Sequence, residues 1–166
     1  MAEKDKIIEQ KVKYNGLFDF KETYQFIYRY LMEEGYDVEE QKYIEEVGSD
    51  AKKIEITWVA TKKISDYFKN EIKLAWRIIG MKSVEVDKGG QKIKMNTGAI
   101  EIKVTGNLIK DWEGTWENNP TMKFLRGVYD KYIVEGRIKK YEQKLFADTN
   151  NISEQIKAFF SVEGMK

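Results

Sequence analysis

The sequence predicts an α+β fold, in which one antiparallel β-sheet is packed on one face by an N-terminal helix and a long C-terminal helix. Three observations predict it. The central part of the chain alternates apolar and charged residues with a period of two, as a sheet does when one face packs on helices and the other meets water. A helical period precedes this region and another follows it. The 166 residues contain no linker or internal repeat, so we expect a single domain over residues 1–166.

The first strand and helix are marked by a change of period. Apolar and polar residues alternate over 7–14, which predicts a strand. Asp19 and Glu22 have the spacing of a helix capping box, and the apolar residues from Phe20 to Leu31 recur on one side of a helix. We expect this helix to stop at Gly35.

From residue 37 to about 112 the sequence predicts several strands, with clear alternation over 53–60, 68–78 and 100–108. Turn signals at 48–50 and 88–90 predict hairpins between neighbouring strands. Asn70 interrupts the apolar row between Phe68 and Ile72. It is either a polar group that faces a cavity or a β-bulge that shifts the register, and we favour the bulge.

The C-terminal part predicts two helices. Pro120 stands where a helix would begin, and the chain from Thr121 to about Leu145 has the pattern of a long helix. We expect the polar run at 148–150 to break it. Asn151 and Glu154 repeat the capping spacing, which predicts a short separate terminal helix.

The sequence contains no histidine and no cysteine. Without histidine, the chain lacks the side chain whose unperturbed pKa lies near neutrality. Without cysteine, it can form no disulfide, no thiolate nucleophile and no zinc site of the Cys/His kind. We therefore expect no cofactor and no metal site. Carboxylates such as Glu71, Glu85 and Glu101 alternate with lysines on predicted solvent faces, which is typical of cross-strand ion pairs. A carboxylate-based enzyme stays open as an alternative.

Charge and hydropathy limit the partners. Lys and Arg number 29 against 28 Asp and Glu, a net charge of +1, so a nucleic-acid-binding role would need a local basic patch. No stretch has the apolar run of a secretory signal or of a membrane span. We expect a cytoplasmic protein with no membrane partner.

Aromatic residues supply the first candidate site. Trp58 and Trp76 fall on predicted apolar strand faces. Aromatic residues at strand spacing usually fill the core, and we favour that interpretation, but a curved sheet around a helix can also enclose an apolar ligand. The candidate ligand-binding residues are Trp58, Phe68, Asn70, Trp76 and Tyr132.

A basic stripe supplies the second candidate site. At about 100° per residue, five cations of the long predicted helix fall on one side, opposite Phe124 and Leu125. Such a stripe is usually a solvated face, although it could also contact RNA phosphates or an acidic protein. The candidate partner-binding residues are Lys123, Arg126, Arg137, Lys140 and Lys144.

Segments of the central region resemble a group of small uncharacterised archaeal proteins; they are 54–58, 66–68, 84–86, 94–96, 100–102 and 111–113. This resemblance implies an archaeal origin and no site residues. The order of elements is also similar to the helix-grip, or START-like, fold, which implies an apolar cavity between the sheet and the C-terminal helix. The chain differs from that fold in having one helix after the first strand and a broken C-terminal helix.

These observations favour a non-catalytic cytoplasmic binding or interaction domain of unidentified partner. Within this class two hypotheses remain: an apolar small molecule held between the sheet and the C-terminal helix, and a protein or RNA held by the basic helix stripe.

Overall fold

The computed structural model describes residues 3–112, 120–128, 131 and 135–165, and it confirms the α+β class. The elements follow in the order β1 (Glu3–Phe18), α1 (Phe20–Glu33), β2 (Asp37–Val47), β3 (Lys52–Lys63), β4 (Phe68–Lys88), β5 (Gln91–Lys110), α2 (Pro120–Val128) and α3 (Glu135–Met165).

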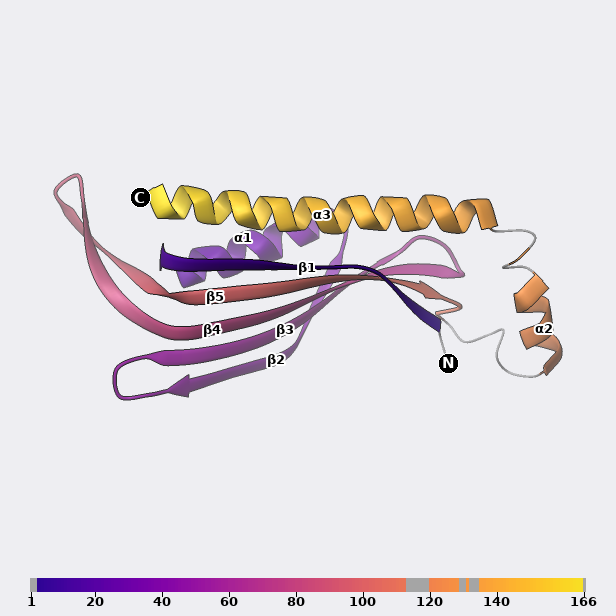
Figure 1. The fold of residues 1–166 in the computed structure, drawn as a ribbon, viewed down its shortest axis with the longest axis horizontal. Helices are drawn as coiled ribbons and strands as arrows, with labels where there is room; N and C mark the ends of the chain where they lie inside the picture. The colour runs from indigo at the N-terminus through magenta and orange to yellow at the C-terminus, as the bar shows by residue number, and fades with distance from the viewer. Residues whose placement is uncertain (1–2, 113–119, 129–130, 132–134, 166) are drawn as a thin grey trace.

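The strands form one antiparallel sheet in the order β1-β5-β4-β3-β2, so β1 and β2 are its edges. The long helix α3 runs along β1 and β5, and α1 packs against β2 and α3 on the same side (Figure 1). We call the covered side the inner face and the opposite side the outer face. The predicted alternation is confirmed, because buried and less buried residues alternate along β3 and along much of β4 and β5.

The core lies between the inner face and the two helices. The sheet contributes the apolar rows predicted from the sequence. Helix α1 contributes Ile27 and Leu31, and α3 contributes Leu145, Ile152, Ile156 and Phe160. Burying one such aliphatic or aromatic side chain stabilises a fold by about 1.5–3 kcal/mol, so this shared core is what holds the helices on the sheet.

The capping box predicted for α1 is partly confirmed. The backbone N–H of Glu22 donates to the Asp19 carboxylate at 3.1 Å, which satisfies one of the free N–H groups at the helix start. The helix ends at Glu33, and Gly35 follows with φ +88°, a left-handed conformation that glycine adopts without a Cβ clash. These local signals position α1 over the sheet.

The β-bulge predicted at Asn70 is wrong. The register of β4 against β5 is continuous there, because Asn70 pairs with Leu108 and Glu71 with Asn107. The shift in this strand pair lies between Ile79 and Lys82 instead. Asn70 therefore keeps its place in the inner row, where it is 2% exposed.

The predicted division of the C-terminal region is also wrong. A helix begins at Pro120 as predicted, but α2 ends at Val128, and α3 then runs unbroken through residues 148–151. Polar side chains of this stretch bond inside the helix: Thr149 Oγ1 donates to the Leu145 carbonyl at 2.8 Å, and Ser153 Oγ to the Thr149 carbonyl at 3.2 Å. Because these bonds satisfy the side chains locally, the helix can continue with its polar residues buried.

Candidate functional site

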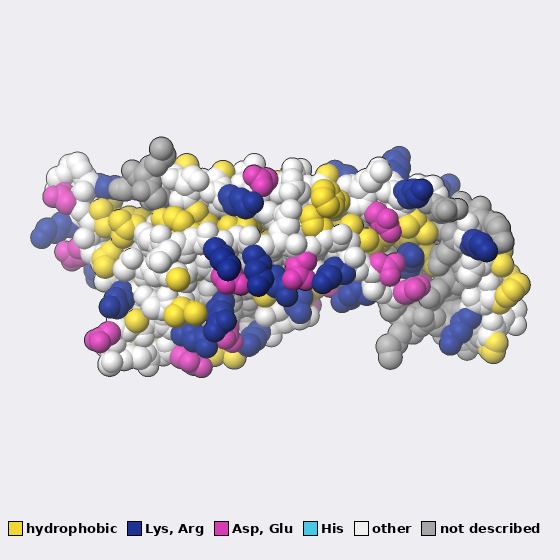
Figure 2. Space-filling view, viewed as in Figure 1, with side chains coloured by type: hydrophobic (Ala, Val, Ile, Leu, Met, Phe, Trp, Pro, Cys, Tyr) yellow, Lys and Arg dark blue, Asp and Glu magenta, His cyan; other side chains and the backbone are white. Residues whose placement is uncertain are grey.

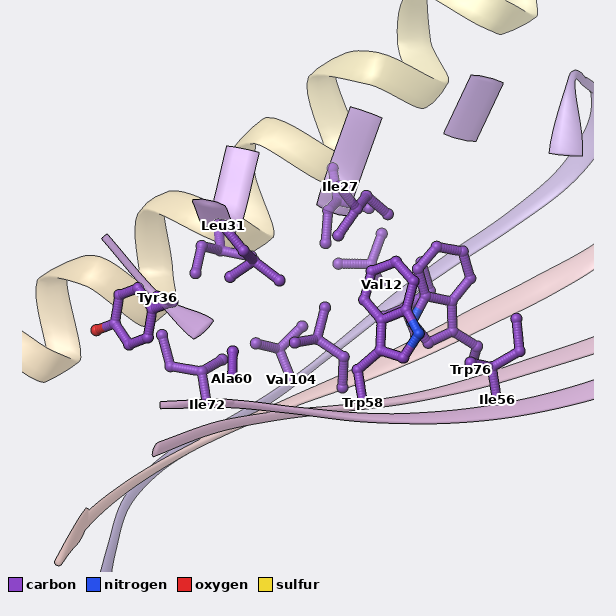
Figure 3. Close-up of a cluster of buried hydrophobic side chains, with 14 of the residues drawn as sticks. Val12, Ile27, Leu31, Tyr36, Ile56, Trp58, Ala60, Ile72, Trp76 and Val104 are labelled. Carbon is purple, nitrogen blue, oxygen red and sulfur yellow. The ribbon is translucent and has the colours of Figure 1, made fainter. Parts of the chain in front are cut away.

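The predicted ligand-binding residues lie in the packed core. Trp58 is 0% exposed and Trp76 is 2% exposed, and their rings meet edge to face at 4.9 Å between centroids. Phe68 is also buried, and its ring lies 5.0 Å from that of Tyr141 on α3. Figure 3 shows the two indoles side by side, with aliphatic side chains filling the space toward α1 and α3. Tyr132 lies outside the described residues.

Asn70 contacts Tyr36 in a cluster of buried and half-buried polar side chains between the sheet and α3, which the sequence did not reveal. The Tyr36 hydroxyl donates to the Asp148 carboxylate at 3.2 Å, and Gln10 Nε2 donates to Asn150 Oδ1 at 3.0 Å. Burial, together with the nearby Asp148 charge, raises the pKa of Tyr36 far above its usual range. In Figure 3 the Tyr36 hydroxyl points away from the apolar side chains. The cluster ties α3 to the sheet.

The basic stripe predicted on one helix is divided between two. Lys123 lies on α2, whereas Arg137, Lys140 and Lys144 lie on α3, where all three are exposed. Lys144 forms an ion pair with Asp148 at 3.1 Å. The side chain of Arg126 lies outside the described residues. The prediction of a single continuous stripe is therefore wrong, although three of its cations share one exposed side of α3.

Two of the three carboxylates considered for catalysis, Glu71 and Glu101, form ion pairs or hydrogen bonds. Glu71 accepts hydrogen bonds from Lys4 at 3.0 Å and from Asn107 at 3.1 Å, and Glu101 pairs with Lys11 at 3.7 Å. Within the described ranges, no group of three acidic side chains is arranged to hold a metal ion. No helix in that part of the chain is long and apolar enough to cross a bilayer.

A different site lies where α1 meets the edge strand β2. We call it the α1–β2 surface and define it by Tyr24, Tyr28 and Met32 of α1 and Glu40 and Tyr43 of β2. Tyr28, Met32 and Tyr43 are each more than 40% exposed, an unusual grouping of large apolar side chains in water. A hollow of about 350 Å³ runs along the α1 side, lined by Tyr24, Gln25, Tyr28, Arg29 and Met32.

Glu40 is the polar centre of this surface. Its Oε1 atom accepts two hydrogen bonds, from the Tyr24 hydroxyl at 2.8 Å and from Trp58 Nε1 at 3.2 Å. The Tyr24 ring packs edge to face on Trp58 at 4.8 Å, so both donors are held by aromatic packing. Burial, with the Glu40 carboxylate beside it, raises the pKa of Tyr24 to about 12.

The Glu40 carboxylate is oriented but not neutralised. Glu40 is exposed, and no lysine or arginine in the described part of the chain forms an ion pair with it. The strand that carries it is strongly acidic: β2 contains Asp37, Glu39, Glu40, Glu45 and Glu46 but only Lys42 as a cation. The i, i+4 spacing of Tyr24 and Tyr28 was visible in the sequence, whereas the pairing of Tyr24 with Glu40 depends on how α1 docks on the sheet.

Comparison with known proteins gave no match to a protein-family model, a curated protein or a solved structure.

Proposed function

We propose that this protein is a non-catalytic, cytoplasmic binding domain that holds a basic segment of a partner protein at the α1–β2 surface. The observation that carries the proposal is the Glu40 carboxylate, which two aromatic donors orient while no cation among the described residues neutralises it. The absence of histidine and cysteine supports a binding role over catalysis, because the usual acid–base and nucleophilic groups are missing.

The chemistry of the site suits an ammonium or guanidinium group. Because Oε1 is occupied by Tyr24 and Trp58, Oε2 is the oxygen left for a partner's donor, and charge-assisted hydrogen bonds of this kind are stronger than neutral ones. The exposed rings of Tyr28 and Tyr43 provide aromatic faces, which attract cations by about 0.5–1 kcal/mol at exposed sites. Carboxylate and rings together favour a lysine or arginine side chain.

The backbone of β2 adds a second reason for a peptide partner. As an edge strand, β2 is paired only with β3, so its other side presents N–H and C=O groups that an extended segment can bond. The acidic side chains of β2 favour a basic segment and disfavour the same strand of a second copy.

The proposal is tested with an extended model peptide of alternating lysine and valine, titrated into the full chain and followed by calorimetry. We expect Glu40→Gln to weaken binding at least fivefold, because it removes the charge and leaves the peptide ammonium without its acceptor. Tyr28→Leu should weaken it by a smaller factor, because it removes an aromatic face but keeps apolar bulk.

Glu39→Gln is the matched control. Glu39 is the neighbouring residue on the same strand and is exposed, but it pairs with Val59 and points to the outer face, whereas Glu40 pairs with Trp58 on the inner face. Both variants change the net charge equally. An equal loss of peptide affinity in both variants would show a diffuse charge effect and would contradict the proposed binding site. Absence of peptide binding by the unmodified protein would contradict it as well.

A further inference from the structure

The outer face of the sheet is much more basic than the net charge of +1 indicates. The register places the following charges there on three adjacent strands. β1 presents Lys4, Lys6, Lys11 and Lys13 but only Glu9. β4 presents Lys69, Lys73 and Arg77 but only Glu71, and β5 presents Lys103 and Glu101. Figure 2 shows Lys and Arg side chains gathered over these strands. The acidic residues of β2 lie at the opposite edge, so the fold separates charges that cancel in the sequence.

The cations on this face are not all neutralised. Lys11 pairs with Glu101 at 3.7 Å, and Lys103 pairs with Glu9 at 3.1 Å. Lys13, Lys73 and Arg77 form no ion pair with any residue that the structure describes. Hydrogen bonds from Lys6 and Lys103 lower the pKa of Glu9, and a hydrogen bond from Lys42 lowers the pKa of Glu55. Nearby positive charge favours the ionised form of a carboxyl group, so both shifts agree with a positive potential on this face.

The same face is hollowed around Arg77. One open hollow of about 400 Å³ is lined by Lys13, Asn15, Arg77 and Glu101 among others. A second of about 220 Å³ includes Lys42, Arg77, Glu101 and Lys103 in its lining. Because the two hollows share Arg77 and Glu101, they adjoin at the middle of the sheet. Small side chains form part of the floor, with Ala99 in the first hollow and Ala75 in the second.

We infer that the outer face binds the phosphate backbone of a nucleic acid, with Lys13, Lys73 and Arg77, which pair with no acidic residue in the described ranges, as its main contacts. Lysine and arginine on rigid strands can neutralise successive phosphates and release their counterions. None of the outward-facing residues of β1, β5, β4 and β3 is aromatic, so the strands themselves offer no platform for stacking bases. One ring, that of Trp112, lies at the end of this face, with Lys63 Nζ 4.6 Å and Lys69 Nζ 5.5 Å from its centroid. Binding should therefore depend weakly on sequence and strongly on salt.

This site is independent of the α1–β2 surface. Glu40 belongs to the inner side of β2, whereas Arg77 belongs to the outer side of β4. A nucleic acid and a basic protein segment could thus be held at the same time on opposite faces of one sheet.

The test measures fluorescence anisotropy of a labelled, mixed-sequence 20-nucleotide single-stranded RNA with the full chain over a series of salt concentrations. The triple variant Lys13→Gln, Lys73→Gln and Arg77→Gln should lose about tenfold or more in affinity at low salt. The slope of log affinity against log salt should fall by about two to three, roughly one for each phosphate contact removed.

The matched control is the triple variant Arg137→Gln, Lys140→Gln and Lys144→Gln, which removes the same charge from the exposed side of α3. We expect its affinity to stay within about twofold of the unmodified protein and its salt slope to be unchanged. Circular dichroism establishes that both variants are folded. Equal losses in the two triples, absence of RNA binding at low salt, or equally tight binding of polyglutamate would overturn the inference.

Discussion

Thr149 of α3 lies directly against Gly106 of β5: a Cβ atom added at Gly106 would meet the Thr149 Oγ1 atom at 2.5 Å. Such a distance is not tolerated between real Cβ atoms and their neighbours, so the helix can approach the sheet this closely only because residue 106 is glycine. Thr149 has little freedom to move away, since its hydroxyl donates to the Leu145 carbonyl at 2.8 Å within a buried turn. This contact sets the distance between α3 and β5.

We therefore expect Gly106→Ala to destabilise the protein by about 1–3 kcal/mol, as overpacking in a core does. Chemical denaturation measures the change in the free energy of unfolding. The double variant with Thr149→Ala should be more stable than the sum of the two single changes predicts, because the clashing hydroxyl has been removed.

Gly136→Ala is the control for the same substitution on α3, where a Cβ atom meets nothing within 4 Å. It should stabilise the protein by up to about 1 kcal/mol, since alanine is the better helix residue. Gly106→Ala with stability equal to that of the unmodified protein would show that α3 and β5 do not lie this close.

The elements predicted correctly are those whose signals are local. Alternation along 53–60 and 68–78 follows directly from which face of a strand is covered, and the Asp19 cap depends on residues three positions apart. Such patterns can be recognised in the sequence because each residue's environment is decided by its near neighbours or by a simple period.

The features that were missed depend on partners far away in the chain. The polar run at 148–150 resembles a helix break, yet Asp148 is held by Tyr36 and Asn150 by Gln10, more than a hundred residues earlier. Glu40 is one of several acidic residues in β2, and only the docking of α1 gives it two aromatic donors. No local period distinguishes these residues from solvated ones.

The continuity of α3 can be tested at Asn151, which is exposed in the middle of the helix. If a second helix began there, Asn151 would be its N-cap, and Asn151→Ala would cost about 0.5–2 kcal/mol. In a continuous helix the same change replaces a weak helix former with the best one, and should stabilise by up to about 0.7 kcal/mol. Thermal or chemical unfolding gives the sign, and a clear loss of stability would contradict the unbroken helix.

The C-terminal half of α3 should contribute strongly to stability through Phe160. This residue is 3% exposed, and its ring stacks on Tyr14 of β1 at 4.8 Å between centroids. Truncating a buried phenylalanine to alanine typically costs about 3–5 kcal/mol, so we expect Phe160→Ala to lower the free energy of unfolding by about 3 kcal/mol or more.

Phe146→Ala is the matched change on the same helix, because Phe146 is 49% exposed. It should cost much less, about 1 kcal/mol or below, since little buried surface is lost. Similar losses for the two variants in urea unfolding would mean that the side of α3 facing the sheet is assigned wrongly.

The hydrogen bond from Tyr24 to Glu40 should be visible as a shifted titration. Burial is the largest cause, and the adjacent Glu40 carboxylate the next, of a Tyr24 pKa raised to about 12. An unperturbed tyrosine has a pKa of about 10. Because the folded-state value is the higher one, the stability that Tyr24 contributes is fully present below about pH 10 and is lost as the pH rises toward about 12. Nuclear magnetic resonance of ring-labelled tyrosine follows this group, and Tyr24→Phe identifies its signal.

Glu40→Gln separates the two causes of this shift. Removing the carboxylate charge should lower the Tyr24 pKa toward its ordinary value, while the part due to burial stays. Tyr36, whose raised pKa is due to burial and Asp148, should be unchanged in the same variant and serves as the internal control. If Tyr24 titrated near about 10 in the unmodified protein, the Glu40 carboxylate would not be held by the tyrosine, and the oriented acceptor at the α1–β2 surface would lose its basis.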